Sequence, residues 1–371
     1  MPGKAYRATI LIVEDEEGPR NALKVILRPF FNLCVVESGQ AAMMAFREQP
    51  IDLVTLDLKL PDCQGVDLLR EIKQERDDVE VIIITGYGSL KSSMDAIRYG
   101  AAGYLLKPFN VTELIALIHQ TLEKKRRLDC VRAFLRTYGG EWGAGRNSAA
   151  AWNHLHQDYF SLPQTKQNPD SRFGAYSEYA PLLSDLLEAK SRDLLHHSYR
   201  VTFYSNLLAK ALRLGAAEQQ ALSIGSFLHD IGKVAIHDGN SSHAGNLDAT
   251  EPEAIKQHTD IGARIILPIQ LPAEIGQIIS YHHEWFDGSG YPSGLHGNGI
   301  PLFARIVCIA QAFDHLVSAP PGRLAMSIEE ASEQIRRQAG THFDPSLAEL
   351  FAREVNASKD SLPALASSSL S

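Results

Sequence analysis

The chain has 371 residues, of which 44% are hydrophobic and 22% charged, and its formal net charge is −8. This composition is typical of globular protein and provides enough apolar material for two cores. The negative charge argues against a dedicated DNA-binding protein, because phosphate contacts require clustered Lys and Arg. The short basic run at 124–127 is better interpreted as a solvated helix end.

No apolar stretch approaches the roughly 18 residues that a membrane span requires. The apolar run Thr9–Val13 is followed at once by four acidic residues, which is the wrong flank for a signal peptide. The four cysteines are scattered without C-x-x-C spacing, as in proteins of a reducing compartment. We therefore expect a cytoplasmic protein with no membrane span.

The first 122 residues alternate short apolar runs with amphipathic segments of helical spacing. The apolar runs are Ile10–Val13, Leu33–Val36, Leu53–Leu58, Val81–Thr85 and Gly103–Leu106. Strands this apolar are buried on both faces, so five βα repeats predict a parallel sheet covered by helices on both sides. We expect a doubly wound α/β domain over residues 7–124.

Polar side chains follow the carboxyl ends of these predicted strands, where open α/β sheets place their functional sites. Glu14 and Asp15 follow the first strand, Asp57 the third, Thr85 the fourth and Lys107 the fifth. Three carboxylates at one edge repel one another unless a cation lies between them, and hard oxygen ligands favour Mg²⁺. Asp57 can then accept a phosphoryl group, with Lys107 neutralising the new charge and the Thr85 hydroxyl donating to a phosphoryl oxygen.

This set of residues, with the dipeptide Lys107-Pro108, resembles the receiver domain of bacterial response regulators. The resemblance implies a flavodoxin-like five-stranded fold, phosphorylation at Asp57, a sensor histidine kinase as partner and a homodimer. It also implies that Tyr104 is an aromatic switch residue that turns inward when Thr85 engages phosphate. An edge-strand aromatic without that role is the alternative interpretation of Tyr104.

Between residues 125 and 180 the periodicity dissolves. Nearly 60 residues is long for a plain linker, so connecting helices are as plausible as disorder. From 181 to 355 apolar residues recur at helical spacing, which predicts an all-α domain whose second helix is capped at Gly215. The tail 356–371 is rich in serine and alanine and is expected to fray.

The second domain contains a run of side chains that commonly bind metals. They are His197, His229, Asp230, His258, His282 and His283. A single histidine on a helix is usually structural, and only this grouping raises the odds of a site. Neutral imidazoles around a bridging carboxylate suit Fe, Mn, Ni or Zn, and two such ions can present a hydroxide to a phosphodiester. Lys233, one turn beyond Asp230, can hold the phosphate or steady the carboxylate.

The segment His282–Pro292 resembles the signature loop of the HD-GYP family residue for residue, and His229–Lys233 matches the HD motif of that family. The resemblance covers about residues 190–352 and implies an HD-type phosphohydrolase fold that hydrolyses cyclic di-GMP to pGpG or GMP. It implies two transition-metal ions bound by the six side chains named above. It also assigns Gly290, Tyr291 and Pro292 to a loop that meets substrate or a partner.

Three other positions in this domain bear on metal binding. Asp193 falls where some members carry a glutamate for an extra metal, but an exposed helix-face carboxylate is the better interpretation. The family has an aspartate ligand where this chain has Gln311, and a neutral amide weakens binding of at least one metal. Asp314, one turn further on, could substitute for it.

The family's Arg-Pro-Tyr-Arg stretch appears here as Pro320-Pro321-Gly322-Arg323, so that only Arg323 remains as a substrate contact. The loop at 240–245 also lacks the family's usual residues. These departures keep a second hypothesis open. In it, the domain is a non-catalytic module that binds cyclic di-GMP or docks a partner such as a diguanylate cyclase.

Overall fold

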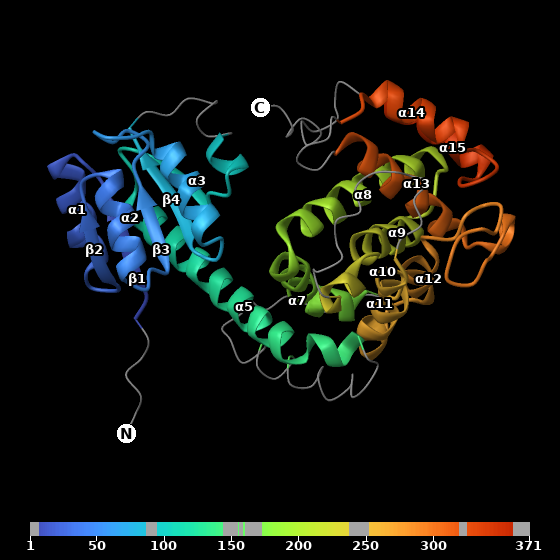
Figure 1. Ribbon diagram of the computed structural model, residues 1–371, viewed down its shortest axis with the longest axis horizontal. Helices are drawn as coiled ribbons and strands as arrows, with labels where there is room; N and C mark the ends of the chain where they lie inside the picture. The colour runs from blue at the N-terminus through green and yellow to red at the C-terminus, as the bar shows by residue number, and fades with distance from the viewer. Residues whose placement is uncertain are drawn as a thin grey trace. The chain divides into compact units, whose positions relative to one another are not determined.

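The computed structural model describes residues 7–86, 95–143, 155, 159, 173–236, 252–318 and 325–358. The chain divides into two compact units, Met1–Asp129 and Cys130–Ser371 (Figure 1). Among the residues described, no helix is long and apolar enough to cross a membrane. Pro320, Arg323, the loop at 240–245 and the tail beyond residue 358 lie outside the described residues.

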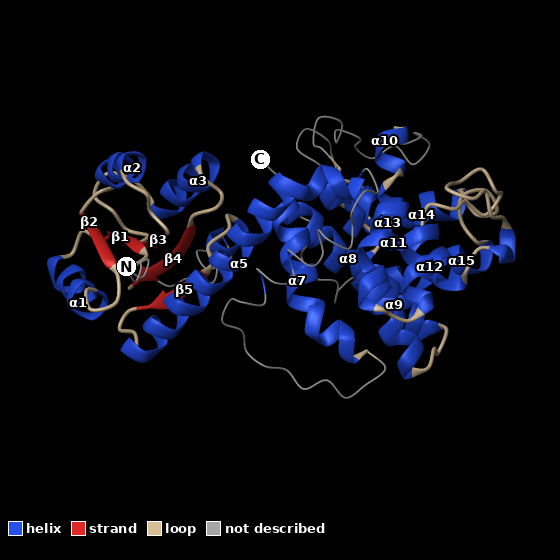
Figure 2. Ribbon diagram, turned by 90° about the horizontal axis from the view of Figure 1, so that it is seen from below, coloured by secondary structure: helices blue, strands red, loops and turns tan. Residues whose placement is uncertain are grey.

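The first unit is a five-stranded parallel sheet with the strand order β2-β1-β3-β4-β5. Its strands are β1 (Thr9–Val13), β2 (Asn32–Val36), β3 (Leu53–Leu56), β4 (Glu80–Thr85) and β5 (Gly103–Leu106). Its helices are α1 (Glu17–Leu27), α2 (Gly39–Glu48), α3 (Gly65–Glu75) and the first part of α5 (Val111–Gly143), which continues into the second unit. Figure 2 shows α2 and α3 over one face of the sheet and α1 and α5 over the other. The predicted doubly wound α/β fold is confirmed.

Alternation along β1 explains why both faces of the sheet are covered. Ile10 and Ile12 pack into the apolar cluster beneath α1 and α5, whereas Leu11 and Val13 pack into the cluster beneath α2 and α3. Successive side chains of a strand point to opposite faces, so an uninterrupted apolar run requires a layer on each side. The parallel arrangement then brings the carboxyl ends of all five strands to one edge.

Helix α5 extends well past the predicted domain boundary at residue 124. The basic run in it is not wholly solvated as expected, because Lys125 is only 6% exposed. Its ammonium donates to the carbonyl oxygen of Asp78 at 3.0 Å and lies 3.0 Å from Oδ2 of Asp129. These contacts hold the middle of α5 to the start of β4, which is why the lysine stem is buried there.

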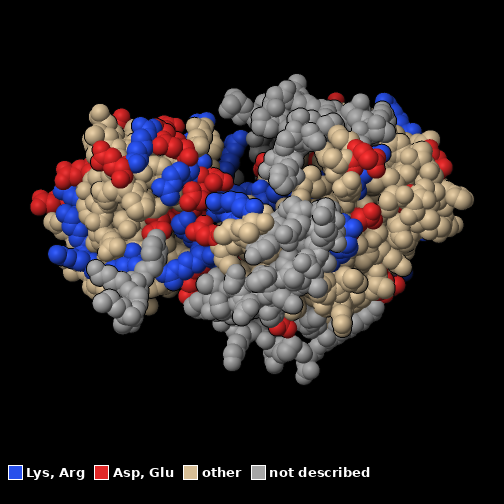
Figure 3. Space-filling model, turned by 60° about the horizontal axis from the view of Figure 1, so that its bottom comes forward, with Lys and Arg blue, Asp and Glu red and all other residues tan. Residues whose placement is uncertain are grey.

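The face of the first unit seen in Figure 3 carries basic and acidic side chains intermixed. Pairs of this kind join its surface helices, as where Arg47 of α2 lies 2.8 Å from a carboxylate oxygen of Glu75 on α3. On that face the cations therefore do not gather into one positive stripe.

The regular secondary structure of the second unit is helical within the described residues, apart from an isolated bridge between Ala339 and Phe343. Its longer helices are α7 (Gly174–Lys190), α8 (Arg192–Ala211), α9 (Ala216–Leu228), α11 (His258–Ile266), α12 (Ala273–Tyr281), α13 (Leu302–Val317), α14 (Ile328–Arg337) and α15 (Pro345–Ala357). Short elements are η1 (Ile231–Ala235), α10 (Glu253–Lys256), η3 (Leu267–Ile269) and η4 (Gly297–Gly299). The prediction of an all-α second domain is confirmed.

The predicted helix end at Gly215 was wrong. Helix α8 ends at Ala211, and Arg213 takes a left-handed conformation with φ of 54° while the Leu214 amide donates back to the carbonyl of Ala209. Gly215 instead precedes α9 as its N-cap. A helix can end at a glycine or at another residue in the left-handed conformation. Here Arg213 takes that conformation, so α8 ends before Gly215 is reached.

Two backbones meet closely where η1 crosses α11. A Cβ atom at Gly232 would lie 1.9 Å from the carbonyl oxygen of His258, so only glycine fits there. This contact draws the segment that carries His229 and Asp230 against the start of α11. The glycine of the motif therefore has a packing reason, which is to bring His258 beside Asp230.

We expect Gly232→Ala to lower the free energy of unfolding of the second unit by about 2–4 kcal/mol, because the added methyl group must push two backbones apart. Urea unfolding followed by tryptophan fluorescence measures this, since all three tryptophans lie in the second unit. Gly276→Ala in α12 is the matched control. Its Cβ would meet nothing within 4 Å, so it should leave stability equal or raise it slightly. Equal effects of the two substitutions would contradict this account of Gly232.

Candidate functional site

The first candidate site lies at the carboxyl edge of the sheet. The Lys107 ammonium bridges two buried carboxylates, at 2.6 Å from Oε2 of Glu14 and 2.6 Å from Oδ2 of Asp57. Glu14, Asp15 and Asp57 bring one oxygen each within 4.8 Å of one another. The structure therefore brings together the predicted phosphoacceptor, its lysine and the three carboxylates.

The electrostatics of this edge suit a cation. Burial raises the pKa of Glu14 above its ordinary value, although the Lys107 ammonium opposes that shift. Burial by itself would lower the pKa of Lys107, but its hydrogen bonds to Asp57 and Glu14 raise it. Oε1 of Glu14 is buried and makes no hydrogen bond within the described residues. A hard cation such as Mg²⁺ fits a site in which an acceptor oxygen lacks a donor.

Two further predicted residues stand near this edge. Thr85 is fully buried at the end of β4, where its carbonyl accepts from the amide of Lys107. Tyr104 is partly buried against the apolar cluster beneath α2 and α3, and its hydroxyl makes no hydrogen bond within the described part of the chain. A hollow of about 160 Å³ opens at the carboxylate edge, and it is lined by Asp15, Glu16, Asp57, Lys59, Gly86 and Lys107.

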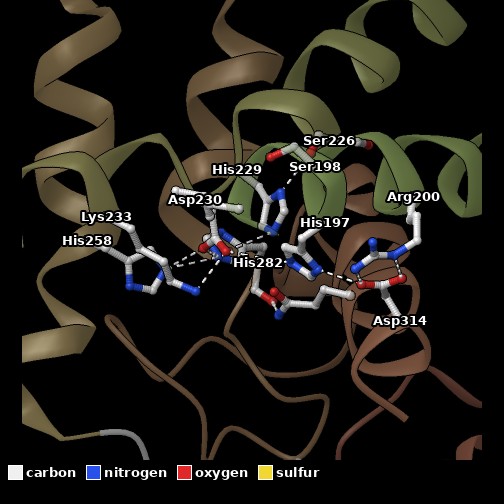
Figure 4. A network of polar contacts seen from close by, with 12 residues as sticks. His197, Ser198, Arg200, Ser226, His229, Asp230, Lys233, His258, His282 and Asp314 are labelled. Atoms are coloured by element: carbon white, nitrogen blue, oxygen red, sulfur yellow. Dashed lines mark hydrogen bonds and ion pairs between the residues drawn. The ribbon is translucent and has the colours of Figure 1, made fainter. Parts of the chain in front are cut away.

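The second candidate site is built around Asp230, which is 1% exposed. Two groups of ligand-type atoms share its carboxylate, and within each group the atoms lie within 4.8 Å of one another. One group adds His258, His282 and His283, and the other adds His197 and His229. All six predicted ligands therefore meet in one place, from α8, the end of α9, the start of α11 and the end of α12. Figure 4 labels five of them, all but His283.

Backbone carbonyls orient three of these imidazoles. Nδ1 of His229 lies 2.7 Å from the carbonyl of Ser226, and Nδ1 of His258 lies 2.7 Å from that of Ile255. Nδ1 of His282 lies 3.0 Å from the carbonyl of Ile279. A carbonyl can only accept, so each Nδ1 carries the proton and each Nε2 turns its lone pair toward Asp230. This tautomer is the one that binds a metal through Nε2.

A carboxylate orients the fourth imidazole. Nδ1 of His197 lies 2.7 Å from Oδ2 of Asp314, and Arg200 binds both oxygens of the same carboxylate at 2.6 and 2.9 Å (Figure 4). Asp314 therefore positions His197 and does not join either group of ligand-type atoms found among the described residues. The Gln311 amide donates to the carbonyl of His282 at 3.3 Å. Asp193, for which a role as ligand of an extra metal was the less favoured interpretation, is exposed and lies outside both groups of ligand-type atoms.

The six residues fit a pair of transition-metal ions. Nε2 of His197 and Nε2 of His229 are buried without a hydrogen bond within the described residues, at 3.7 and 3.4 Å from Oδ2 of Asp230. Nε2 of His258 lies 3.2 Å from Nε2 of His282. Ligands bound at about 2.1 Å to one ion stand roughly 3–3.5 Å apart, so these spacings match a shared cation.

Charges in the cluster are those that metal binding requires. Burial raises the pKa of Asp230, but the Lys233 ammonium at 2.7 Å and the neighbouring His229 bring it well below its ordinary value. Burial lowers the pKa of His258 well below its ordinary value and lowers that of His282 as well. Asp230 is therefore anionic and both imidazoles are neutral at neutral pH.

The predicted loop closes the cluster on one side. The Tyr291 ring stacks on the ring of His283 with centroids 4.7 Å apart, and the Lys256 ammonium lies 5.4 Å from the centre of the Tyr291 ring. Glu284, which is buried, accepts from the amides of Ser293 and Leu295 and fixes the loop. Gly290 is required because a Cβ there would lie 2.3 Å from the amide nitrogen of Trp285.

Comparison with known proteins decides the family. The family model of the response regulator receiver domain matches residues 10–119, and that of the HD domain matches residues 181–347. This chain is a response regulator that contains a receiver domain and an HD domain. The order of its two domains matches the order of the two sites described above.

Relatives of this response regulator have names that specify activities. It is 29% identical over 352 residues to a "Cyclic di-GMP phosphodiesterase" of Thermotoga maritima, covering 93% of this chain and 90% of that protein. It is 28% identical to the "Cyclic di-GMP phosphodiesterase response regulator RpfG" of Xanthomonas campestris, covering 93% and 87%. Over 170 residues, which are 45% of this chain and 33% of the relative, it is 37% identical to a "3'3'-cGAMP-specific phosphodiesterase 2" of Vibrio cholerae.

Sequence reasoning missed two residues of the HD domain site. Arg200 was not singled out, although its spacing of one turn from His197 was visible and its charge suits a partner carboxylate. His315, next to Asp314 in α13, stacks on the His197 ring. A lone histidine near a helix end gives no signal of a site in the sequence.

We expect the metal-free response regulator to lose stability as pH falls below 6.5. His258 and His282 have lowered pKa values in the folded state, so below the unfolded value of about 6.5 only the unfolded chain takes up their protons. Each then lowers the free energy of unfolding by up to about 1.4 kcal/mol per pH unit, and above pH 6.5 neither contributes. Urea unfolding of chelator-treated protein at pH 7.5, 6.5 and 5.5 measures this. His258→Gln should show a shallower slope, and equal slopes for variant and wild type would refute this cause.

Proposed function

We propose that this response regulator is a phosphorylation-controlled, metal-dependent phosphodiesterase that hydrolyses cyclic di-GMP to pGpG or GMP. The cluster of five histidines around the buried Asp230 carboxylate carries this proposal. The names of the two relatives that span nearly the whole chain support cyclic di-GMP as substrate. The relative named for 3'3'-cGAMP matches only 45% of this chain. That nucleotide is therefore the substrate to compare with cyclic di-GMP in an activity assay.

The residues that would hold two transition-metal ions are those of the two groups sharing Asp230. His258, His282 and His283 would serve one ion, and His197 and His229 the other. Ions of this kind polarise a phosphoryl oxygen and lower the pKa of water. The chain's own contribution is to fix the neutral imidazoles and to keep Asp230 ionised between them.

Lys233 is suited to meet the phosphodiester. Its ammonium lies 2.7 Å from Oδ2 of Asp230, and its side chain is 25% exposed while Asp230 is 1% exposed. An ammonium has three donors, so one can hold the carboxylate while another faces a phosphoryl oxygen. Lys233 is therefore the more exposed member of this ion pair, and a substrate phosphate would meet it before Asp230.

The receiver domain would control the output through Asp57. A sensor histidine kinase would supply the phosphoryl group, with Mg²⁺ held by Glu14, Asp15 and Asp57. The new charge on Asp57 would compete with Glu14 for the Lys107 ammonium, which now lies 2.6 Å from each. We include in the proposal a homodimer as the assembly through which this change reaches the HD domain.

A second candidate function follows from one observation. The Gln311 amide donates to the carbonyl of His282, at a position where the resembled family carries a carboxylate ligand. A site with one anion fewer binds cations less tightly. In this second candidate the HD domain binds cyclic di-GMP without hydrolysing it, or docks a diguanylate cyclase through the loop of Gly290, Tyr291 and Pro292.

We expect the full chain, loaded with Mn²⁺ or Fe²⁺ under reducing conditions, to convert cyclic di-GMP to linear products that chromatography separates. Asp230→Asn should lower turnover by about a hundred-fold or more and reduce the metal content, because both groups lose their shared anion. His196→Ala, a change of an exposed histidine next to His197, is the matched control and should retain both properties. Protein that holds two metals per chain but yields no product would rule out hydrolysis of cyclic di-GMP.

Gln311→Asp separates the two candidate functions. If the wild type is inactive and the variant gains metal and turnover, the non-catalytic module is the better description. Turnover that is already high in the wild type and unchanged in the variant removes that alternative.

We expect beryllofluoride or acetyl phosphate to raise the turnover of the wild type by about five-fold or more, the range of typical coupling between sites. Asp57→Asn should show no such response, since an amide cannot form the acyl phosphate. Asp67→Asn alters an exposed carboxylate on α3 and should respond as the wild type does. A response that survives in Asp57→Asn would place the control elsewhere.

A further inference from the structure

His315 stands in the last turn of α13, beside the candidate metal centre. Its side chain is exposed, and its ring lies parallel to the ring of His197, with centroids 4.9 Å apart and an interplanar angle of 11°. We propose that His315 contacts the substrate by donating a hydrogen bond from its imidazole to a phosphoryl oxygen of the bound cyclic dinucleotide. This inference rests on the proposed function and assigns one more residue to it.

The position of His315 follows from the way His197 is held. Nδ1 of His197 is fixed by Asp314, so its Nε2 faces Asp230 at 3.7 Å. A ring stacked on His197 must therefore stand alongside the group formed by His197, His229 and Asp230. His315 also directly follows Asp314 in α13, and Oδ2 of Asp314 lies 2.7 Å from Nδ1 of His197. His315 thus lies on the border of the cluster, on the side of His197.

His315 is not accounted for as a ligand. The group of His197, His229 and Asp230 is complete without it, and no group of ligand-type atoms found among the described residues includes it. Its exposure leaves part of the ring open to a bound molecule. A neutral imidazole has one N–H donor, and the free oxygens of a phosphodiester are acceptors only, so the two are complementary.

A purely structural role for the His315 ring is the competing explanation. Stacking alone would hold His197 in place, and any planar ring at position 315 would do this equally well. A hydrogen bond from residue 315 to a phosphoryl oxygen instead requires an N–H group, whether or not that group belongs to a ring. Substitutions that keep one property and remove the other therefore separate the two roles.

The test measures binding of cyclic di-GMP to the metal-loaded full chain by rapid filtration, with metal content determined on the same samples. His315→Ala should weaken binding about ten-fold, the usual cost of a hydrogen bond to a charged group, with metal content unchanged. At least one of His315→Gln and His315→Asn, which keep a donor at the reach of Nε2 and Nδ1, should regain most of the affinity. His315→Phe keeps a ring to stack on His197 and should bind as weakly as His315→Ala. His196→Ala should bind as the wild type does.

Three results would overturn the assignment of His315: wild-type affinity in His315→Ala, wild-type affinity in His315→Phe, or loss of metal together with affinity in His315→Ala. The proposed hydrolysis is judged separately, by turnover in the wild type. If the wild type binds cyclic di-GMP without hydrolysing it, the proposed hydrolysis is wrong, and the His315 variants still test whether His315 contacts the bound nucleotide. A wild type that does not bind cyclic di-GMP removes both.

Discussion

The HD domain depends on keeping one carboxylate ionised inside the protein. Asp230 is 1% exposed, and an isolated charge at such a depth is unfavourable by several kcal/mol. The Lys233 ammonium, which is partly exposed, balances the charge of the Asp230 carboxylate. The neutral imidazoles add only lone pairs, and a carboxylate cannot accept these. Nε2 of His197 and Nε2 of His229 are buried without a hydrogen bond within the described residues, so the centre keeps unused lone pairs that a cation could accept. This explains why the imidazoles are oriented by outward hydrogen bonds and turn their remaining nitrogens inward.

Both domains contain a buried aspartate whose negative charge is balanced by a nearby lysine. In each, a lysine ammonium lies between 2.6 and 2.7 Å from a buried aspartate, through Lys107 at Asp57 and Lys233 at Asp230. Both lysine side chains retain some exposure, 14% and 25%, whereas their aspartates are nearly inaccessible. In the proposed function, each lysine would neutralise its carboxylate until a phosphoryl oxygen takes up one of its donors.

The alternation of apolar runs predicted the first fold, because a strand buried on both faces leaves a plain pattern. The resemblance to the HD-GYP family implied which side chains meet in the second domain, and the structure brings them together, although their roles as ligands stay predictions. The sequence did not predict the positioning of His197 by Asp314 and Arg200, since that triangle joins two helices that are more than 100 residues apart. Burial of Lys125 was missed for the same reason, because its partner Asp78 is set by tertiary packing.

The donors around Asp230 come from four separate elements that otherwise meet through apolar packing and the narrow crossing at Gly232. Any cation bound there would link residues of α8, α11 and the ends of α9 and α12 to one another. Ions that bind only the folded state stabilise it by mass action. Scarcity of the ion would then shorten the lifetime of the protein against proteases, so that the amount of this regulator, and not only its rate, would follow the cell's supply of metal.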